Sequence, residues 1–175
     1  MSTDEDRDPI DQAVFLLRII HVVMSLGILM FLVVAVLVMR HGEVLGKDPW
    51  SVTTPMTMIA VISAAMAIVA HVVVPNLAVN AQRRALARGT KADDTPSDAE
   101  ALMALFTTQV IIGTAIIEGA ALLNTVVYFL EGTAVPLLLA VLLLGILLSR
   151  IPSRDAMTTW LGEQVLQLQE ERQIG

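Results

Sequence analysis

The sequence contains no cysteine, which excludes a disulfide framework, a thiolate metal site and a thiol nucleophile. Charged residues are scarce, at 16% of the 175 positions, where a soluble domain has about 25%. The motifs of zinc peptidases, serine hydrolases and phosphate-binding loops are also missing. The net charge of −6 lies in termini and loops and gives no electrostatic case for binding nucleic acid. We therefore expect no catalytic activity, no catalytic residue, no metal and no cofactor.

Long apolar stretches are what the sequence does contain. It is 55% hydrophobic, with a mean hydropathy of +0.73. A helix needs roughly 20 apolar residues to cross the hydrocarbon of a bilayer. Four stretches meet this length and predict transmembrane helices at about residues 14–39, 55–79, 101–130 and 132–150. We therefore expect an all-α membrane protein with a four-helix transmembrane domain over residues 1–150.

The end of the chain differs from these spans because it mixes apolar and charged residues at helical spacing. The apolar positions that share one helical face are Met157, Trp160, Leu161, Val165 and Leu168. This pattern predicts that residues 151–175 form an amphipathic cytoplasmic helix, a surface tail that lies on the membrane or pairs with a partner helix.

Basic residues fall mostly on one side of the predicted spans. That side would hold Arg7, Arg18, Arg83, Arg84, Arg88, Lys91, Arg150, Arg154 and Arg172. Only Arg40 and Lys47 lie on the other side. The positive-inside rule then places both termini and the 80–100 loop in the cytoplasm. The N-terminus is acidic, unlike a secretory signal, so we expect a multi-pass protein of the cell inner (cytoplasmic) membrane that keeps its first span.

Proline residues predict where helices begin, bend and turn. Asp8 followed by Pro9 is typical of an N-cap and a first helical residue, so the first helix should begin well before its apolar stretch. Pro75 removes a backbone donor from the second helix and predicts a kink near its cytoplasmic end. Only residues 131–136 separate the third and fourth spans, which predicts a tight antiparallel hairpin.

Glu118 is the one charged residue between positions 101 and 130. Insertion scales assign a central acidic side chain about 2.5–3.5 kcal/mol, so an acid in a span is a functional-site candidate. Ala115 and Gly119 beside it form a small-xxx-small pair that favours helix packing. At 100° per residue, a supporting polar stripe falls on the same side of the helix and consists of Thr107, Thr114 and Thr125.

Two interpretations of Glu118 are open. Burial disfavours the ionised form of a carboxyl, which is the condition for binding and releasing a proton near neutral pH. A proton path from the cytoplasm would then need a relay, for which Gln109 and His71 are candidates. In the other interpretation, a neutral Glu118 bonds a neighbouring helix and only fixes helix packing. The chain would then be a structural or partner-binding membrane protein.

The run TTQVIIGTAIIEGAAL at residues 107–122 resembles the C-terminal helix of bacterial F-type ATP synthase subunit c, the rotor-ring proteolipid. In that family the carboxylate at the matching position carries the translocated ion, so the resemblance implies that Glu118 binds an ion. Gly119 and Leu123 stand where sodium-type rings have a hydroxyl and a tyrosine, which implies a proton. The resemblance also implies a homo-oligomer or other membrane subunits as partners, and it covers no other part of the chain.

The histidines give a minor alternative. His21 and His71 lie on antiparallel predicted spans, where two imidazoles could be the axial ligands of a b-type haem in a membrane anchor. Single histidines in apolar helices also bond neighbouring helices, so the sequence leaves both roles open.

Overall fold

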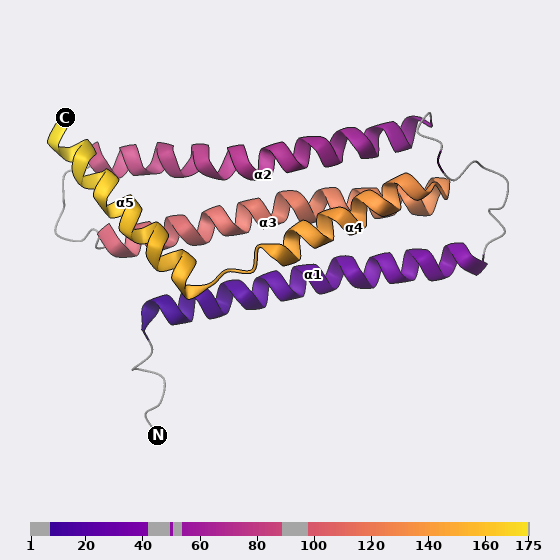
Figure 1. Cartoon of the computed structure of the whole chain (residues 1–175), viewed down its shortest axis with the longest axis horizontal. Coiled ribbons are helices and arrows are strands. Elements are labelled where there is room, and N and C mark those ends of the chain that lie inside the picture. Colours follow the sequence, from indigo (N-terminus) through magenta and orange to yellow (C-terminus); the bar gives the residue numbers. More distant parts are fainter. Residues whose placement is uncertain (1–7, 42–49, 51–53, 89–97, 175) are drawn as a thin grey trace, which may run out of the picture. The chain divides into compact units, whose positions relative to one another are not determined.

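The computed structural model describes residues 8–41, 50, 54–88 and 98–174 of the chain. These residues form five helices and contain no strand (Figure 1). The helices are α1 (Pro9–His41), α2 (Pro55–Arg88), α3 (Asp98–Glu131), α4 (Ala134–Ser149) and α5 (Arg154–Ile174). The predicted all-α fold is therefore confirmed for the described part of the chain.

Three helices, α1, α2 and α3, are long and apolar enough to cross a membrane. The shorter α4 has 16 residues and passes the same test only when it is counted together with α5. The described residues therefore hold three candidate spans, or up to four if that pair forms one span. This count fits the predicted membrane class without fixing the number of spans at four.

Large apolar side chains cover the outer faces of α1 and α2. Those exposed in the structure include Val22, Leu26, Met30, Val34, Ile62, Met66, Val69 and Leu77. Soluble monomers rarely expose contiguous apolar patches larger than a few hundred Å². Faces of this kind suit contact with lipid.

Two compact units divide the chain, and each has its own core. Unit 1 takes its described residues from positions 1–19, 73–112 and 152–175. Unit 2 takes them from positions 20–72 and 113–151. The three long helices α1, α2 and α3 contribute to both units, whereas α4 belongs to unit 2 and α5 to unit 1.

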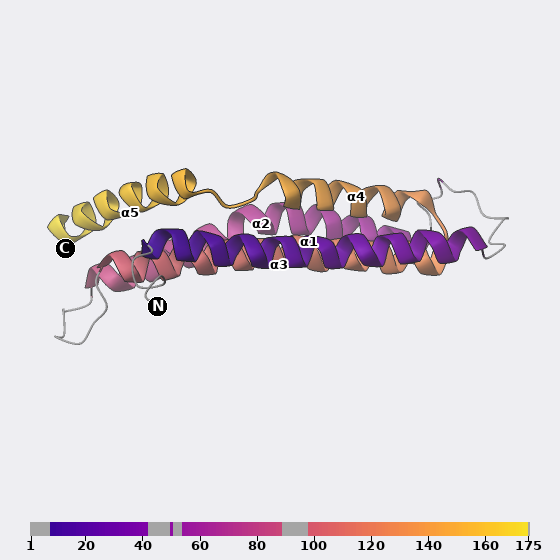
Figure 2. The same cartoon turned by 90° about the horizontal axis from the view of Figure 1, so that it is seen from below.

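In unit 2, α3 lies between α1 and α2 (Figure 1), and α4 covers one side of these helices (Figure 2). All four helices contribute to one apolar core, whose members include Ile28, Ala64, Ala67, Ile117, Ala121, Leu143 and Leu147. The alanines of α2 keep its surface shallow, which allows the neighbouring helices to approach closely. This arrangement makes α3 the most buried of the three long helices.

The turn between α3 and α4 is as short as the sequence predicts. Gly132 has a φ of 71°, a left-handed conformation that glycine adopts without strain. Its N–H donates to the carbonyl of Tyr128 at 2.8 Å and so caps the end of α3. Helix α4 begins at Ala134, and the predicted tight hairpin is confirmed.

Two further helix signals have different outcomes. The side chain of Asp8 accepts a hydrogen bond from the N–H of Ile10 at 3.0 Å, and α1 begins at Pro9. The predicted N-cap is therefore confirmed. Helix α2 continues through Pro75 to Arg88, so Pro75 does not end it, and a kink there stays a prediction.

In unit 1, α5 packs with its apolar face against helices of the same chain. Met157 is fully buried in a core with Val14, Leu17 and Phe106. The ring centroids of Trp160 and Phe106 are 5.3 Å apart. The sequence correctly predicts a helix here, but it predicts a membrane surface or a partner helix where α1 and α3 provide the contact.

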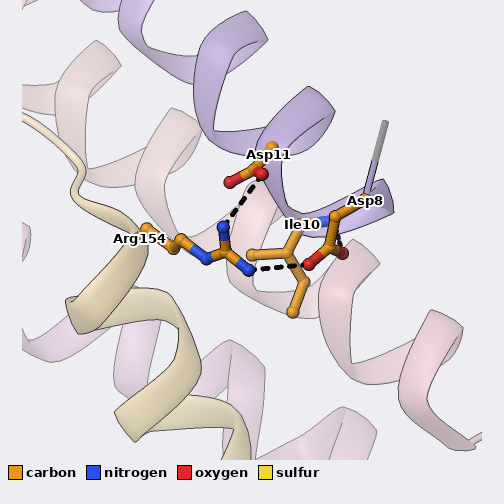
Figure 3. Close-up of polar contacts among 4 residues, drawn as sticks. All are labelled: Asp8, Ile10, Asp11 and Arg154. Carbon is orange, nitrogen blue, oxygen red and sulfur yellow. Dashed lines mark hydrogen bonds and ion pairs between the residues drawn. The ribbon is translucent and has the colours of Figure 1, made fainter. Parts of the chain in front are cut away.

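Arg154, at the start of α5, bridges two carboxylates at the start of α1 (Figure 3). Its Nη2 lies 2.8 Å from Asp8 Oδ2, and its Nη1 lies 2.9 Å from Asp11 Oδ2. All three side chains are exposed, so each ion pair contributes at most about 1 kcal/mol to stability. Asp8 therefore serves both as the cap of α1 and as a partner of α5.

Replacing Asp8 should separate these two roles. Asp8→Ala removes the cap acceptor and one ion pair, and we expect the first turn of α1 to lose about 0.5–2 kcal/mol, as N-cap deletions do. Asp8→Asn keeps an acceptor for the N–H of Ile10 and removes only the charge. The first turn should therefore lose only a few tenths of a kcal/mol. Amide hydrogen exchange of the first turn in detergent measures both. Equal losses in the two variants would contradict the cap assignment.

Candidate functional site

Glu118 lies on α3 within unit 2, and its side chain is half-buried. Within the described residues it forms no hydrogen bond and no ion pair. A carboxylate in hydrocarbon is costly unless it is paired or protonated. Glu118 is thus a polar group whose bonding capacity the described chain does not use.

The small residues next to Glu118 face outward. Ala115 and Gly119 are both exposed, and Leu123 continues the exposed face by one turn. A Cβ placed on Gly119 would have no neighbouring atom within 4 Å. No described helix of this chain packs on the predicted small-xxx-small pair, so its use in helix packing would require another molecule.

The threonines of the predicted stripe do not bond Glu118. Thr107, in unit 1, donates to the carbonyl of Met103 at 3.0 Å, and Thr125 donates to the carbonyl of Ala121 at 2.9 Å. Buried Thr114 lies 3.5 Å from a ring nitrogen of His21. The hydroxyls of Thr107 and Thr125 therefore donate to backbone carbonyls of α3, and that of Thr114 faces His21 of α1.

His21 joins α1 to the last turn of α4 in unit 2. The side chain is 2% exposed, and its Nε2 lies 2.6 Å from the carbonyl oxygen of Leu147. A carbonyl oxygen only accepts hydrogen bonds, so Nε2 must carry the proton. Nδ1 is then the nitrogen that faces Thr114. The neighbouring hydroxyl of Ser25 is buried and has no partner among the described residues.

His71 and Gln109, the predicted relay residues, are not joined by hydrogen bonds in the described structure. His71 Nδ1 lies 2.9 Å from the carbonyl oxygen of Gly113 and donates to it. Gln109 Oε1 is buried without a partner among the described residues. A relay from either residue to Glu118 would therefore need water, which fills such positions between buried polar groups.

The two candidate haem ligands, His21 and His71, each place one ring nitrogen on a backbone carbonyl. A haem iron is held by an imidazole nitrogen with a free lone pair. In His21, Nε2 donates to Leu147 and Nδ1 keeps its lone pair, 3.5 Å from the Thr114 hydroxyl. In His71, Nδ1 is bonded to Gly113. Haem ligation by the pair therefore stays a prediction. The described residues also contain no group of three or more His, Cys, Asp or Glu side chains placed to hold a metal ion.

A second polar cluster, partly buried, surrounds Glu131 at the end of α3 in unit 2. Its Oε2 accepts hydrogen bonds from the hydroxyl of Thr54 at 2.6 Å, and from the hydroxyl and N–H of Thr57 at 2.7 and 3.0 Å. Thr57 and Thr133 are fully buried, and their hydroxyls are 2.8 Å apart. These are hydrogen-bond distances. The carboxylate therefore caps the N-terminus of α2, where the helix dipole also favours a negative charge.

Sequence reasoning missed this cluster for an identifiable reason. Thr54 before Pro55 is a local N-cap signal that marks the start of α2. Nothing in the sequence indicates that the acceptor is Glu131, which lies far along the chain on another helix. The cluster therefore joins α2 to α3. Because Glu131 Oε2 already accepts three hydrogen bonds, this oxygen is not available to bind a ligand.

Removing the Thr57 hydroxyl tests the importance of this joint. Thr57→Val keeps the shape of the side chain but deletes its bonds to Glu131 and Thr133, and we expect a loss of about 1–3 kcal/mol in unfolding free energy. Thermal unfolding in detergent, followed by circular dichroism, gives the difference. Thr108→Val is the control, because Thr108 is exposed and bonds only its own helix; it should change stability by less than about 0.5 kcal/mol. A Thr57 variant as stable as this control would contradict the assignment.

Comparison of the chain with protein-family models, with curated proteins and with solved structures finds no match. The likeness of residues 107–122 to subunit c therefore rests on the sequence of this helix alone.

Proposed function

We propose that this chain is a four-span integral membrane protein of the cell inner membrane, with both termini in the cytoplasm. The exposed apolar faces of α1 and α2 support insertion. Helix α4 would be the fourth span, although its 16 residues reach only about 24 Å. A short span is accommodated when the bilayer thins locally.

The distribution of arginines supports this orientation. Unit 1 contains Arg18, Arg83, Arg84, Arg154 and Arg172 among its described residues. Under the positive-inside rule, these arginines of unit 1 would face the cytoplasm. Three of the basic residues behind the sequence prediction, Arg7, Lys47 and Lys91, lie outside the described residues.

Glu118 would bind and release a proton within the membrane. The observation that carries this proposal is its half-buried carboxyl, which has no partner among the described residues and lies beside the open face of Ala115 and Gly119. A carboxyl that is already tied to neighbouring groups, as Glu131 is, has little freedom to exchange its proton. The resemblance of residues 107–122 to the subunit c helix points to the same role.

The open face also supports the second candidate, a structural or partner-binding protein. A helix of a second copy, or of another membrane subunit, could approach closely at Gly119, where an added Cβ would meet no atom of another helix within 4 Å. Glu118 would then donate a hydrogen bond across that interface and keep its proton. The two candidates share one surface and differ in whether the proton exchanges.

Labelling with a hydrophobic carbodiimide separates the two candidates, because the reagent modifies protonated carboxyls in the membrane. We expect rapid, pH-dependent modification of Glu118, abolished in Glu118→Gln. Glu131, on the same helix and fully engaged through Oε2, is the internal control and should react much more slowly. Inertness of Glu118 from about pH 6 to 9 would leave only the structural role.

Proton flux into liposomes provides an independent measurement. Glu118→Gln should assemble normally, since glutamine has the same shape and still forms hydrogen bonds. If Glu118 carries protons, this variant should lose flux, whereas Glu131→Gln should retain it in whatever protein remains folded. Equal flux in unmodified protein and Glu118→Gln would reject the proton-carrying role.

A further inference from the structure

Arg83 of α2 is enclosed by acceptors from one helix, α5. Its Nε and Nη2 lie 3.1 and 3.0 Å from Glu171 Oε1, and its Nη1 donates to Gln164 Oε1 at 2.8 Å and also to Gln167 Oε1. Positions 164, 167 and 171 recur at helical spacing, so they share one face of α5. The arginine side chain is only 12% exposed. All of these residues belong to unit 1.

The two halves of α5 are held in different ways. The first half is seated by apolar contacts, because Met157, Trp160 and Leu161 pack with the core that contains Phe106. The second half has charged contacts that the first half lacks on α2 and α3, to Arg83 and, through the Arg172 bonds at 2.8 and 3.0 Å, to Asp98. Leu168 is its fully enclosed apolar side chain. Exposed Gly162, where an added Cβ would meet no atom of another helix within 4 Å, lies between the halves.

This difference makes the second half the part of α5 that opens more easily. Segments with few buried apolar contacts open locally at low free energy, while apolar cores stay closed. Glu171 strengthens the contrast, because its Oε2 is buried without a partner among the described residues. One of the two carboxylate oxygens of Glu171 therefore forms no stabilising hydrogen bond while α5 lies on Arg83.

We propose that residues 163–174 are a hinged flap that closes on Arg83 and opens when the phosphate of an anionic lipid replaces Glu171 as its partner. Arginine binds carboxylate and phosphate in the same fork geometry, so the two compete for one site. The flap carries Glu163, Glu170 and Glu171 against the single Arg172, whereas α2 presents Arg83 and Arg84. An anionic membrane surface attracts the arginines and repels the flap. The lipid part rests on the proposed position of the unit 1 arginines on the cytoplasmic side.

Amide hydrogen exchange of the full chain in phosphatidylcholine nanodiscs tests the hinge. Arg83→Gln should raise exchange in residues 163–174 by about tenfold or more, since a charged hydrogen-bond set is lost, and leave residues 154–161 unchanged. Arg84→Gln is the matched control, because Arg84 is the exposed neighbour and should alter neither half. No change in Arg83→Gln would overturn the flap, and faster exchange in both halves would overturn the hinge.

A second readout guards against simple misfolding of the variant. In a Trp50→Phe background, Trp160 is the remaining tryptophan. Its fluorescence emission then shows whether the first half of α5 still packs against Phe106. Its emission should be the same with Arg83 or Gln at position 83. Glu171→Gln should open the flap in the same direction as Arg83→Gln, and closed behaviour in that variant would contradict the role of the carboxylate.

Lipid composition tests the trigger. Replacing half of the phosphatidylcholine by phosphatidylglycerol should raise exchange of residues 163–174 in the unmodified chain and have no further effect in Arg83→Gln. Inorganic phosphate added to phosphatidylcholine nanodiscs should leave the flap closed, and an opening equal to that with phosphatidylglycerol would reject lipid as the source. Exchange unaffected by phosphatidylglycerol would overturn the trigger. None of these measurements involves Glu118, so they are independent of its proton binding.

Discussion

Backbone groups at helix ends have no partner within their own helix and must be bonded by other groups. The structure meets this constraint with side chains taken from other helices. Glu131 of α3 serves the first N–H groups of α2, and His21 of α1 serves a last carbonyl of α4. In unit 1, Arg18 of α1 donates to the carbonyl of Pro152, just before α5. Within each unit, polar contacts of this kind join helix ends, beside an apolar core of its own.

Glu118 and Ser25 differ from most other polar side chains of unit 2 in forming no hydrogen bond among the described residues. Most buried polar side chains of unit 2 have a bonding role: Asn124, for example, donates to the carbonyl of Ala120 at 2.8 Å, and Thr125 to that of Ala121. Glu118 lies on the same helix and takes part in none of the described joints. The described helix contacts therefore do not depend on Glu118, and both proposed roles, proton exchange and a bond to a second molecule, involve groups outside those contacts.

Local features of the fold could be predicted from the sequence, and distant contacts could not. Apolar length gave the long helices, the Asp8–Pro9 pair gave the start of α1, and the short 131–136 segment gave the hairpin, since each signal involves neighbouring residues. The bond of Glu131 to Thr57 and the enclosure of Arg83 by α5 join residues far apart in the chain, and no local pattern marks them. The apolar face of α5 was visible in the sequence, whereas its partner was not. At the candidate site, the helical position of Glu118 was predictable, but the outward direction of Ala115 and Gly119 required the structure.

The bond from His21 to Leu147 has a consequence for the length of α4. The carbonyl of Leu147 also accepts the N–H of Arg150, the residue at which α4 stops being helical. Two donors thus meet on one oxygen, and one of them belongs to another helix. The position of His21 on α1 therefore contributes to where α4 ends. If α4 crosses the membrane, its length would be fixed by contact with α1 and not by the thickness of the bilayer.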